Sequence, residues 1–172
     1  MSDRSIHLYL DIDGVLNAYE RRALTGYHSQ WSGGYVQHGY ESVAPAMVER
    51  INELVSRYGI KTHWLTTWMK EAPAFGRQIG LEGCEAWPIL EARHGVGSNW
   101  PKFTSIKAHV EATKPDLAFW FDDDLETETD AMRWAFQTPG VTAFAPNGVH
   151  GITPGMLRAV ERIIHQSAEV AA

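Results

Sequence analysis

The clearest structural signal in this chain is residues 6–16, which read Ile-His-Leu-Tyr-Leu-Asp-Ile-Asp-Gly-Val-Leu. The apolar run at the start predicts a buried β-strand over about residues 6–11, and Asp11 and Asp13 come where that strand ends. Two unit charges about 4 Å apart repel each other by roughly 4 kcal/mol at an effective dielectric constant near 20. We therefore expect a cation, either a metal ion or a lysine, next to this carboxylate pair.

Beyond this strand the sequence alternates between strand-like and helix-like segments. Residues 44–58 carry an apolar stripe at helical spacing that ends before Gly59, whereas the apolar run 117–121 is typical of a strand buried on both faces. The predicted strands are 6–11, 60–66, 84–89, 117–121 and 141–145, and the predicted helices are 44–58, 68–79, 102–113, 125–137 and 154–167.

This alternation predicts an α/β fold, namely a three-layer Rossmann-like parallel sheet flanked by helices. In such sheets the ligand site lies beyond the carboxyl ends of the strands. Those ends carry polar side chains in this chain: Asp11 and Asp13 follow the first strand, Thr66 ends the second, and Asp122 and Asp123 follow strand 117–121. We expect these groups to converge on one rim of the sheet.

Residues 18–43 interrupt the alternation and are too long for a simple strand-to-helix loop. The glycines predict a β-hairpin that turns at Ser32-Gly33-Gly34. Because it starts directly after the carboxylate pair, this hairpin is expected to fold over the site as a flap; the alternative is a surface hairpin with packed aromatic residues. A length of 172 residues with 44% hydrophobic content predicts one domain, 1–172, with 18–43 as a small flap or cap insertion.

Four motifs occur in order along the chain. The first is a hydrophobic strand followed by Asp11-Ile12-Asp13-Gly14-Val15-Leu16, and the second is a strand that ends at Thr66. The third is a lysine near the start of a later helix, and the fourth is the strand 119–121 followed by Asp122-Asp123. With these motifs the chain resembles the haloacid dehalogenase-like (HAD) superfamily of phosphohydrolases, in its small capless or minimally capped type. The resemblance spans almost the whole sequence.

The resemblance implies a phosphomonoester hydrolase that works through an aspartyl-phosphate intermediate. Asp11 would be the nucleophile that attacks phosphorus. Asp13 lies two residues further and points to the same side of an extended chain, so it would protonate the leaving oxygen and then accept a proton from the hydrolytic water.

The resemblance also implies a Mg²⁺ cofactor, whose charge would offset that of the carboxylates. Its oxygen ligands would come from Asp11, the main-chain carbonyl of Asp13, and Asp122 or Asp123, with water and phosphate completing the octahedron. One of Asp123 and Asp124 is expected to be the N-cap of the helix that follows.

Phosphate binding is assigned to Thr66, Gly14 and one lysine. Thr66 would hydrogen-bond a phosphate oxygen, and Gly14 would let the main chain turn and present its amides. Lys102 follows Trp100-Pro101, a typical helix start, and is favoured over Lys107, one turn deeper; Lys114 is a weaker third candidate. Thr66 has an alternative interpretation as an ordinary buried β-branched residue.

Several other functions stay open. A polynucleotide-end phosphatase acting in nucleic-acid repair would use the same motifs, but no basic run supports a nucleic-acid track. Haloacid dehalogenation would use the same nucleophile but has no need of Asp13. A catalytically idle HAD-like binding module would leave the buried charges without a use.

The charge and the cysteine content bear on the expected partner and on the cellular location. The formal net charge is −6, and it arises from residues 122–130, which hold six acids and no base. The expected partner is a phosphorylated small molecule or nucleotide. No membrane partner is expected, and the charge does not indicate a nucleic acid, although it does not exclude one. Cys84 is the only cysteine and no signal peptide is evident, so a cytoplasmic location is expected.

Overall fold

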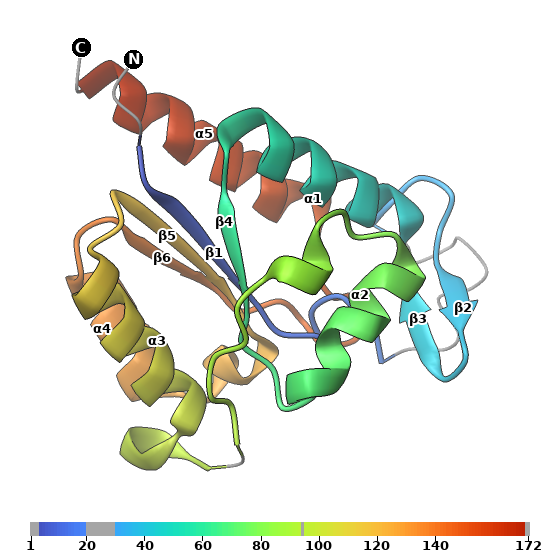
Figure 1. Ribbon diagram of the computed structural model, residues 1–172, viewed down its shortest axis with the longest axis horizontal. Helices are drawn as coiled ribbons and strands as arrows, with labels where there is room; N and C mark the ends of the chain where they lie inside the picture. Colours follow the sequence, from blue (N-terminus) through green and yellow to red (C-terminus); the bar gives the residue numbers. More distant parts are fainter. Residues whose placement is uncertain (1–3, 20–29, 94, 171–172) are drawn as a thin grey trace.

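Parallel strands form the centre of the computed structural model, which describes residues 4–19, 30–93 and 95–170 (Figure 1). The sheet order is β4-β1-β5-β6, and β1 pairs in parallel register with both β4 and β5. The strands are β1 (Ile6–Leu10), β2 (Val36–His38), β3 (Glu41–Val43), β4 (Lys61–Trp64), β5 (Leu117–Phe121) and β6 (Val141–Phe144). The α-helices are α1 (Pro45–Tyr58), α2 (Ala72–Ile79), α3 (Pro101–Thr113), α4 (Thr129–Gln137) and α5 (Pro154–Val170).

Helices cover both faces of the sheet, so the predicted three-layer α/β fold is confirmed (Figure 1). Ile6, Leu8 and Leu10 of β1 pack on the side of α1, α2 and α5. The alternate residue Tyr9 packs with Ile106 of α3 on the opposite side. This two-residue alternation within buried strands follows from the pleat of the sheet.

The helix and strand boundaries follow local signals in the sequence. Proline occupies the first turn of α1, α2 and α3, where its missing amide costs nothing because the first amides of a helix have no partner. Gly59 ends α1 in the left-handed conformation with φ = 62°. The predicted helix 125–137 is divided into a 3₁₀ helix, Asp123–Glu126, and α4.

The predicted strand 84–89 is wrong. Cys84–Ala86 form a 3₁₀ helix that starts after Gly83, whose φ of 70° turns the chain away from an extended path. Only Ile89 bridges to Trp64, at the outer edge of β4. The segment therefore lies against the sheet edge without forming a regular strand there.

The hairpin is present, but its predicted turn is misplaced. Strands β2 and β3 pair antiparallel and turn at Gly39-Tyr40, not at Ser32-Gly33-Gly34. Part of the predicted flap, residues 20–29, lies outside the described residues. The described part is fastened beside the end of β1, because Ala18 N donates to Ser42 O at 2.8 Å.

No helix in the described ranges is both long enough and apolar enough to cross a membrane.

Candidate active site

Three neighbouring strands end at the same place, and their polar residues meet there. Asp11 N donates to Phe121 O at 3.1 Å, and Leu65 N donates to Leu10 O at 2.9 Å, so the strand ends are held level. Asp11, Thr66 and Asp122 follow directly and are all buried. The parallel register thus brings together groups that are more than 50 residues apart in the sequence.

Lys102 is the cation of this site. Its Nζ lies 2.5 Å from Asp11 Oδ2 and 2.9 Å from Asp122 Oδ2, and only 2% of the residue is exposed. Pro101 starts α3, so Lys102 projects from the first turn of that helix toward the strand ends. Lys107, on the same helix, is exposed to solvent and has no such contact, and Lys114 lies beyond the far end of the helix.

The electrostatics show an excess of negative charge around this lysine. Burial raises the pKa of Asp11, against the opposing effect of Lys102. Burial and then the charge of Asp11 raise the pKa of Asp122 well above its usual range. Burial alone would lower the pKa of Lys102, but the two carboxylates outweigh it and raise that pKa.

A third carboxylate, Asp123, adds to the excess. Burial, followed by the charges of Asp11 and Asp124, raises the pKa of Asp123 to about 6. Carboxylate oxygens of Asp11, Asp122 and Asp123 lie within 4.8 Å of one another. We call these three residues the carboxylate rim.

The donor set of the carboxylate rim fits a divalent cation. Hard oxygen ligands from carboxylates suit Mg²⁺, and three raised pKa values indicate that one lysine does not balance the rim. The Asp13 carboxylate is not part of this group of three.

Asp13 is held by two donors instead. Asn17 Nδ2 donates to Asp13 Oδ1 at 2.7 Å, and Trp68 Nε1 donates to Asp13 Oδ2 at 2.8 Å. Asn17 in turn accepts from Ser42 N of β3 at 2.8 Å, which ties the hairpin to the site. This carboxylate is therefore oriented from two directions.

Gly14 provides space rather than a donor. Its φ is 68°, and a Cβ built there would lie 2.1 Å from Asp123 Oδ2. The Gly14 amide donates to Asn17 O at 2.8 Å, so it already has a partner within the turn. The absence of a side chain lets Asp123 approach the turn after β1.

Residues 7–155 match the family described as the HAD domain in Swiss Army Knife RNA repair proteins. This match covers well over half of the chain. The protein belongs to this HAD family. The resemblance inferred from the four motifs is therefore confirmed. A comparison with curated proteins finds no match.

Three residues of this HAD site were not identified from sequence. Asn17 and Trp68 orient Asp13, and Tyr19 lies over Asp123, where a hydrogen bond between them contributes to the pKa of both side chains. Asn17 and Tyr19 follow the first motif within a few residues, and this proximity is the signal that could have identified them. Nothing in the sequence marks the indole N–H of Trp68 as a donor.

The helix cap after β5 differs from expectation. Asp122, not Asp123 or Asp124, is the N-cap of the 3₁₀ helix, since its side chain accepts from Asp124 N. Asp122 therefore joins the ion pair with Lys102 and caps the turn that presents Asp123.

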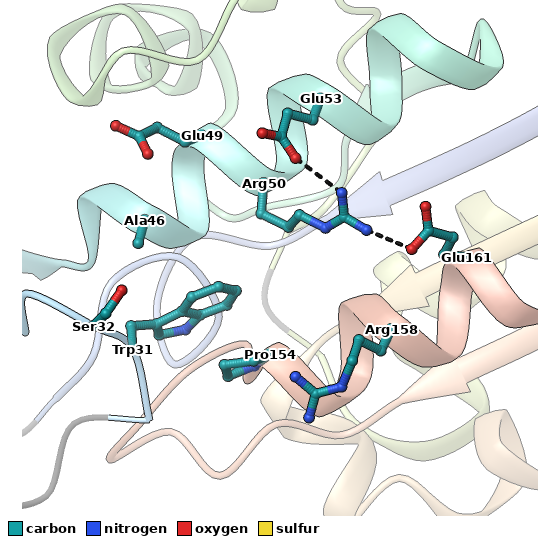
Figure 2. A pocket seen from close by; sticks show the side chains of 9 residues that line it. All are labelled: Trp31, Ser32, Ala46, Glu49, Arg50, Glu53, Pro154, Arg158 and Glu161. Carbon is teal, nitrogen blue, oxygen red and sulfur yellow. Dashed lines mark hydrogen bonds and ion pairs between the residues drawn. The ribbon is translucent and has the colours of Figure 1, made fainter.

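A pocket of about 460 Å³ in this HAD domain lies between α1 and α5 (Figure 2). Arg50 crosses it and pairs with Glu53 and Glu161, at 2.8 and 2.5 Å. None of the rim carboxylates line this pocket, so it is separate from the candidate active site.

Proposed function

We propose that this HAD domain is a Mg²⁺-dependent phosphomonoester hydrolase with Asp11 as its nucleophile. The observation that carries the proposal is the contact of Lys102 with Asp11 and Asp122 at the end of β1, beside an oriented Asp13. A buried carboxylate kept next to a lysine has the placement that nucleophilic attack on an anionic phosphate requires.

The reaction proceeds in two steps. In the first, an Asp11 oxygen bonds to phosphorus while the bond from phosphorus to the leaving oxygen breaks, and Asp13 gives its proton to that oxygen. In the second, water loses a proton to Asp13 and attacks phosphorus, which releases inorganic phosphate and restores Asp11. Each Asp13 oxygen accepts one hydrogen bond and keeps a second lone pair for the proton.

The remaining groups bind the phosphate and the metal. Lys102 and Thr66 contact the phosphate oxygens, and a side-chain hydrogen bond of Thr66 to Asp11 supports its position at this site. Asp11 with Asp122 or Asp123 holds Mg²⁺. When bound, this cation neutralises carboxylate charge and polarises the phosphoryl group.

Two substrate classes follow from different observations. A phosphorylated small molecule or nucleotide is favoured by the acidic surroundings of the site, which repel a long polyanion. A polynucleotide end is favoured by the family match, whose description names RNA repair proteins. In the second case, only the terminal phosphate would reach the carboxylate rim.

A phosphate-release assay tests the reaction and the substrate class together. Purified protein is supplied with nucleotides, sugar phosphates, and RNA oligonucleotides carrying either a 5′- or a 3′-phosphate, in Mg²⁺ or in EDTA. We expect turnover in Mg²⁺ that is lost in EDTA and in Asp11→Asn. The matched control is Asp130→Asn, which removes an exposed acid paired only with Arg133 in the described structure.

Two results would contradict the proposal. Activity that survives both EDTA and Asp11→Asn would exclude this mechanism. If no substrate is hydrolysed and calorimetry detects no Mg²⁺ binding, the idle binding module is the better interpretation. Acid-quenched protein that carries label from a ³²P-phosphorylated substrate, released by hydroxylamine, would support the aspartyl-phosphate.

A further inference from the structure

Three histidines from different elements meet on the α3 face of the sheet. His7 lies in β1, His63 in β4 and His109 in α3. Because β1 runs toward Asp11, His7 lies four residues before it, about 13 Å away along the strand at roughly 3.3 Å per residue. The histidine cluster, defined as these three residues, is therefore separate from the carboxylate rim.

The spacing of the cluster suits one ion. One ring nitrogen from each histidine lies within 4.8 Å of the other two. The ring centroids are 5.0 Å apart for His7 and His63, 4.5 Å for His63 and His109, and 5.6 Å for His7 and His109. Three imidazoles around a tetrahedral Zn²⁺, with Zn–N bonds of about 2.0–2.1 Å, place their centroids roughly 5 Å apart.

The burial and hydrogen bonding of His63 are a second, independent observation. Only 5% of His63 is exposed to solvent, and neither of its ring nitrogens has a hydrogen-bond partner. Buried polar groups without a partner are rare in folded proteins. The His63 ring stacks on Tyr9, lies edge-on to His109 and is tilted by 33° relative to His7, so it is packed between the other two imidazoles.

The other two histidines are oriented by hydroxyl groups. Ser5 Oγ lies 3.1 Å from His7 Nε2, and Tyr9 Oη lies 2.8 Å from His109 Nδ1. Hydrogen bonds of this kind fix the ring and tautomer of metal-ligating histidines. The longer contact, 3.3 Å between His7 Nδ1 and Tyr9 Oη, is the one that a metal ion would replace.

The imidazoles are in the form that binds metals. Burial, then the charges of His109 and Lys61, lower the pKa of His7 to about 4, and burial followed by the charges of its neighbours lowers that of His63 to about 3. Both rings are neutral at pH 7, so a metal ion need not displace a proton.

We propose that His7, His63 and His109 form a second metal site, which takes Zn²⁺ or a similar imidazole-preferring transition ion and excludes Mg²⁺. Mg²⁺ prefers oxygen ligands, whereas imidazole suits zinc, cobalt, nickel and copper. Water completes the coordination next to the Tyr9 hydroxyl. The ion fastens α3 to β1 and β4, and Lys102 lies two turns before His109 on the same helix, so the metal stabilises the element that carries that lysine.

Cobalt spectroscopy tests this site without measuring activity. Protein saturated with Mg²⁺ is titrated with Co²⁺, whose tetrahedral imidazole complexes absorb strongly in the visible range, unlike octahedral oxygen complexes. We expect one strongly absorbing Co²⁺ per chain, displaced by Zn²⁺ and not by excess Mg²⁺. His63→Phe and His109→Gln each lower the affinity at least tenfold.

Matched controls separate this site from the carboxylate rim and from misfolding. His165→Gln removes an imidazole of α5 that contacts Tyr58, and Asp11→Asn alters the carboxylate rim; both keep the cobalt signal. His109 is only partly buried, so His109→Gln is expected to fold, as circular dichroism will verify. A wild-type protein without the strong absorption, or absorption that persists in both cluster variants, would overturn the proposal.

Discussion

Trp68 donates its indole N–H to Asp13 Oδ2 at 2.8 Å, from the loop that follows β4. The same ring packs against Phe75 of α2, with 5.1 Å between the ring centroids. The acid/base proposed for this site is therefore oriented by a residue that also packs against the core. A substitution that removes the hydrogen bond and keeps the packing will measure how much the orientation of Asp13 contributes to the rate.

Trp68→Phe removes the N–H and keeps an aromatic ring against Phe75. We expect kcat for phosphate release to fall about tenfold to a hundredfold with KM almost unchanged, since proton transfer needs a positioned group while substrate binding does not. The control Trp87→Phe changes a partly buried tryptophan that packs on Trp64 instead. A rise in KM with kcat unchanged would argue against a role of Trp68 in orienting Asp13.

Lys102→Met tests the buried lysine. Removing it leaves Asp11 and Asp122 buried without their cation, which typically costs about 3–5 kcal/mol of unfolding free energy when one partner of a buried pair is lost. We expect a stability loss of this order in EDTA, measured by urea denaturation, together with a loss of at least a hundredfold in kcat/KM. Lys107→Met, on an exposed position of the same helix, should change neither quantity appreciably; if it has the larger effect on activity, Lys102 is not the phosphate-binding lysine.

Gly14→Ala tests the approach of Asp123 to the turn after β1. The new Cβ would overlap the Asp123 carboxylate at 2.1 Å, in addition to the cost of a left-handed residue, about 1–2 kcal/mol. We expect Mg²⁺ affinity to fall at least tenfold in calorimetry, because Asp123 must move. Gly59→Ala has a similar φ of 62° with nothing within 4 Å, so it should lower stability alone. Equal Mg²⁺ affinities in the two variants would show that Asp123 is not a ligand of the metal.

The strand ends were predictable because their signals are local. Buried parallel strands appear as apolar runs, and a parallel sheet brings their carboxyl ends together, so the amino-acid sequence alone predicts that Asp11, Thr66 and Asp122 meet. Lys102 was favoured because a proline at the preceding position marks the first turn of a helix. In each case one residue and its immediate neighbours carried the information.

Features that depend on competition between segments were not predictable. Residues 32–40 contain two glycine turn signals. The hairpin turns at Gly39-Tyr40, because that turn pairs Val36 with Val43, which is buried in the core. The hydrogen bond from Trp68 to Asp13 depends on where the loop after β4 passes. The histidine cluster was also missed, since its members come from three elements and no pair has the spacing of a metal motif.

The histidine cluster should also make the metal-free protein sensitive to acid. His7 and His63 titrate near pH 4 and 3 in the folded protein, against 6.5 for an exposed histidine, so the unfolded chain binds more protons between these values. Stability is then present above pH 6.5 and is lost as the pH falls toward 4, by at most about 1.4 kcal/mol per pH unit for each histidine. The groups facing the two rings are Ser5, Tyr9, Lys61 and His109, none of which supplies a carboxylate to offset a new positive charge.

Urea denaturation in EDTA between pH 4.5 and 7.5, a range of about three pH units around the histidine pKa, measures this dependence. The pKa of Asp123, about 6, lies in the same range, so the informative quantity is the difference between wild type and His63→Phe. The phenylalanine ring retains the stacking on Tyr9 and cannot be protonated, and we expect it to flatten the acid side of the profile by up to about 1 kcal/mol per pH unit. His165→Gln, whose imidazole lies on α5, should follow the wild-type curve. Parallel profiles for wild type and His63→Phe would mean that His63 accepts a proton in the folded protein as readily as in the unfolded chain, and that its burial does not hold the ring neutral.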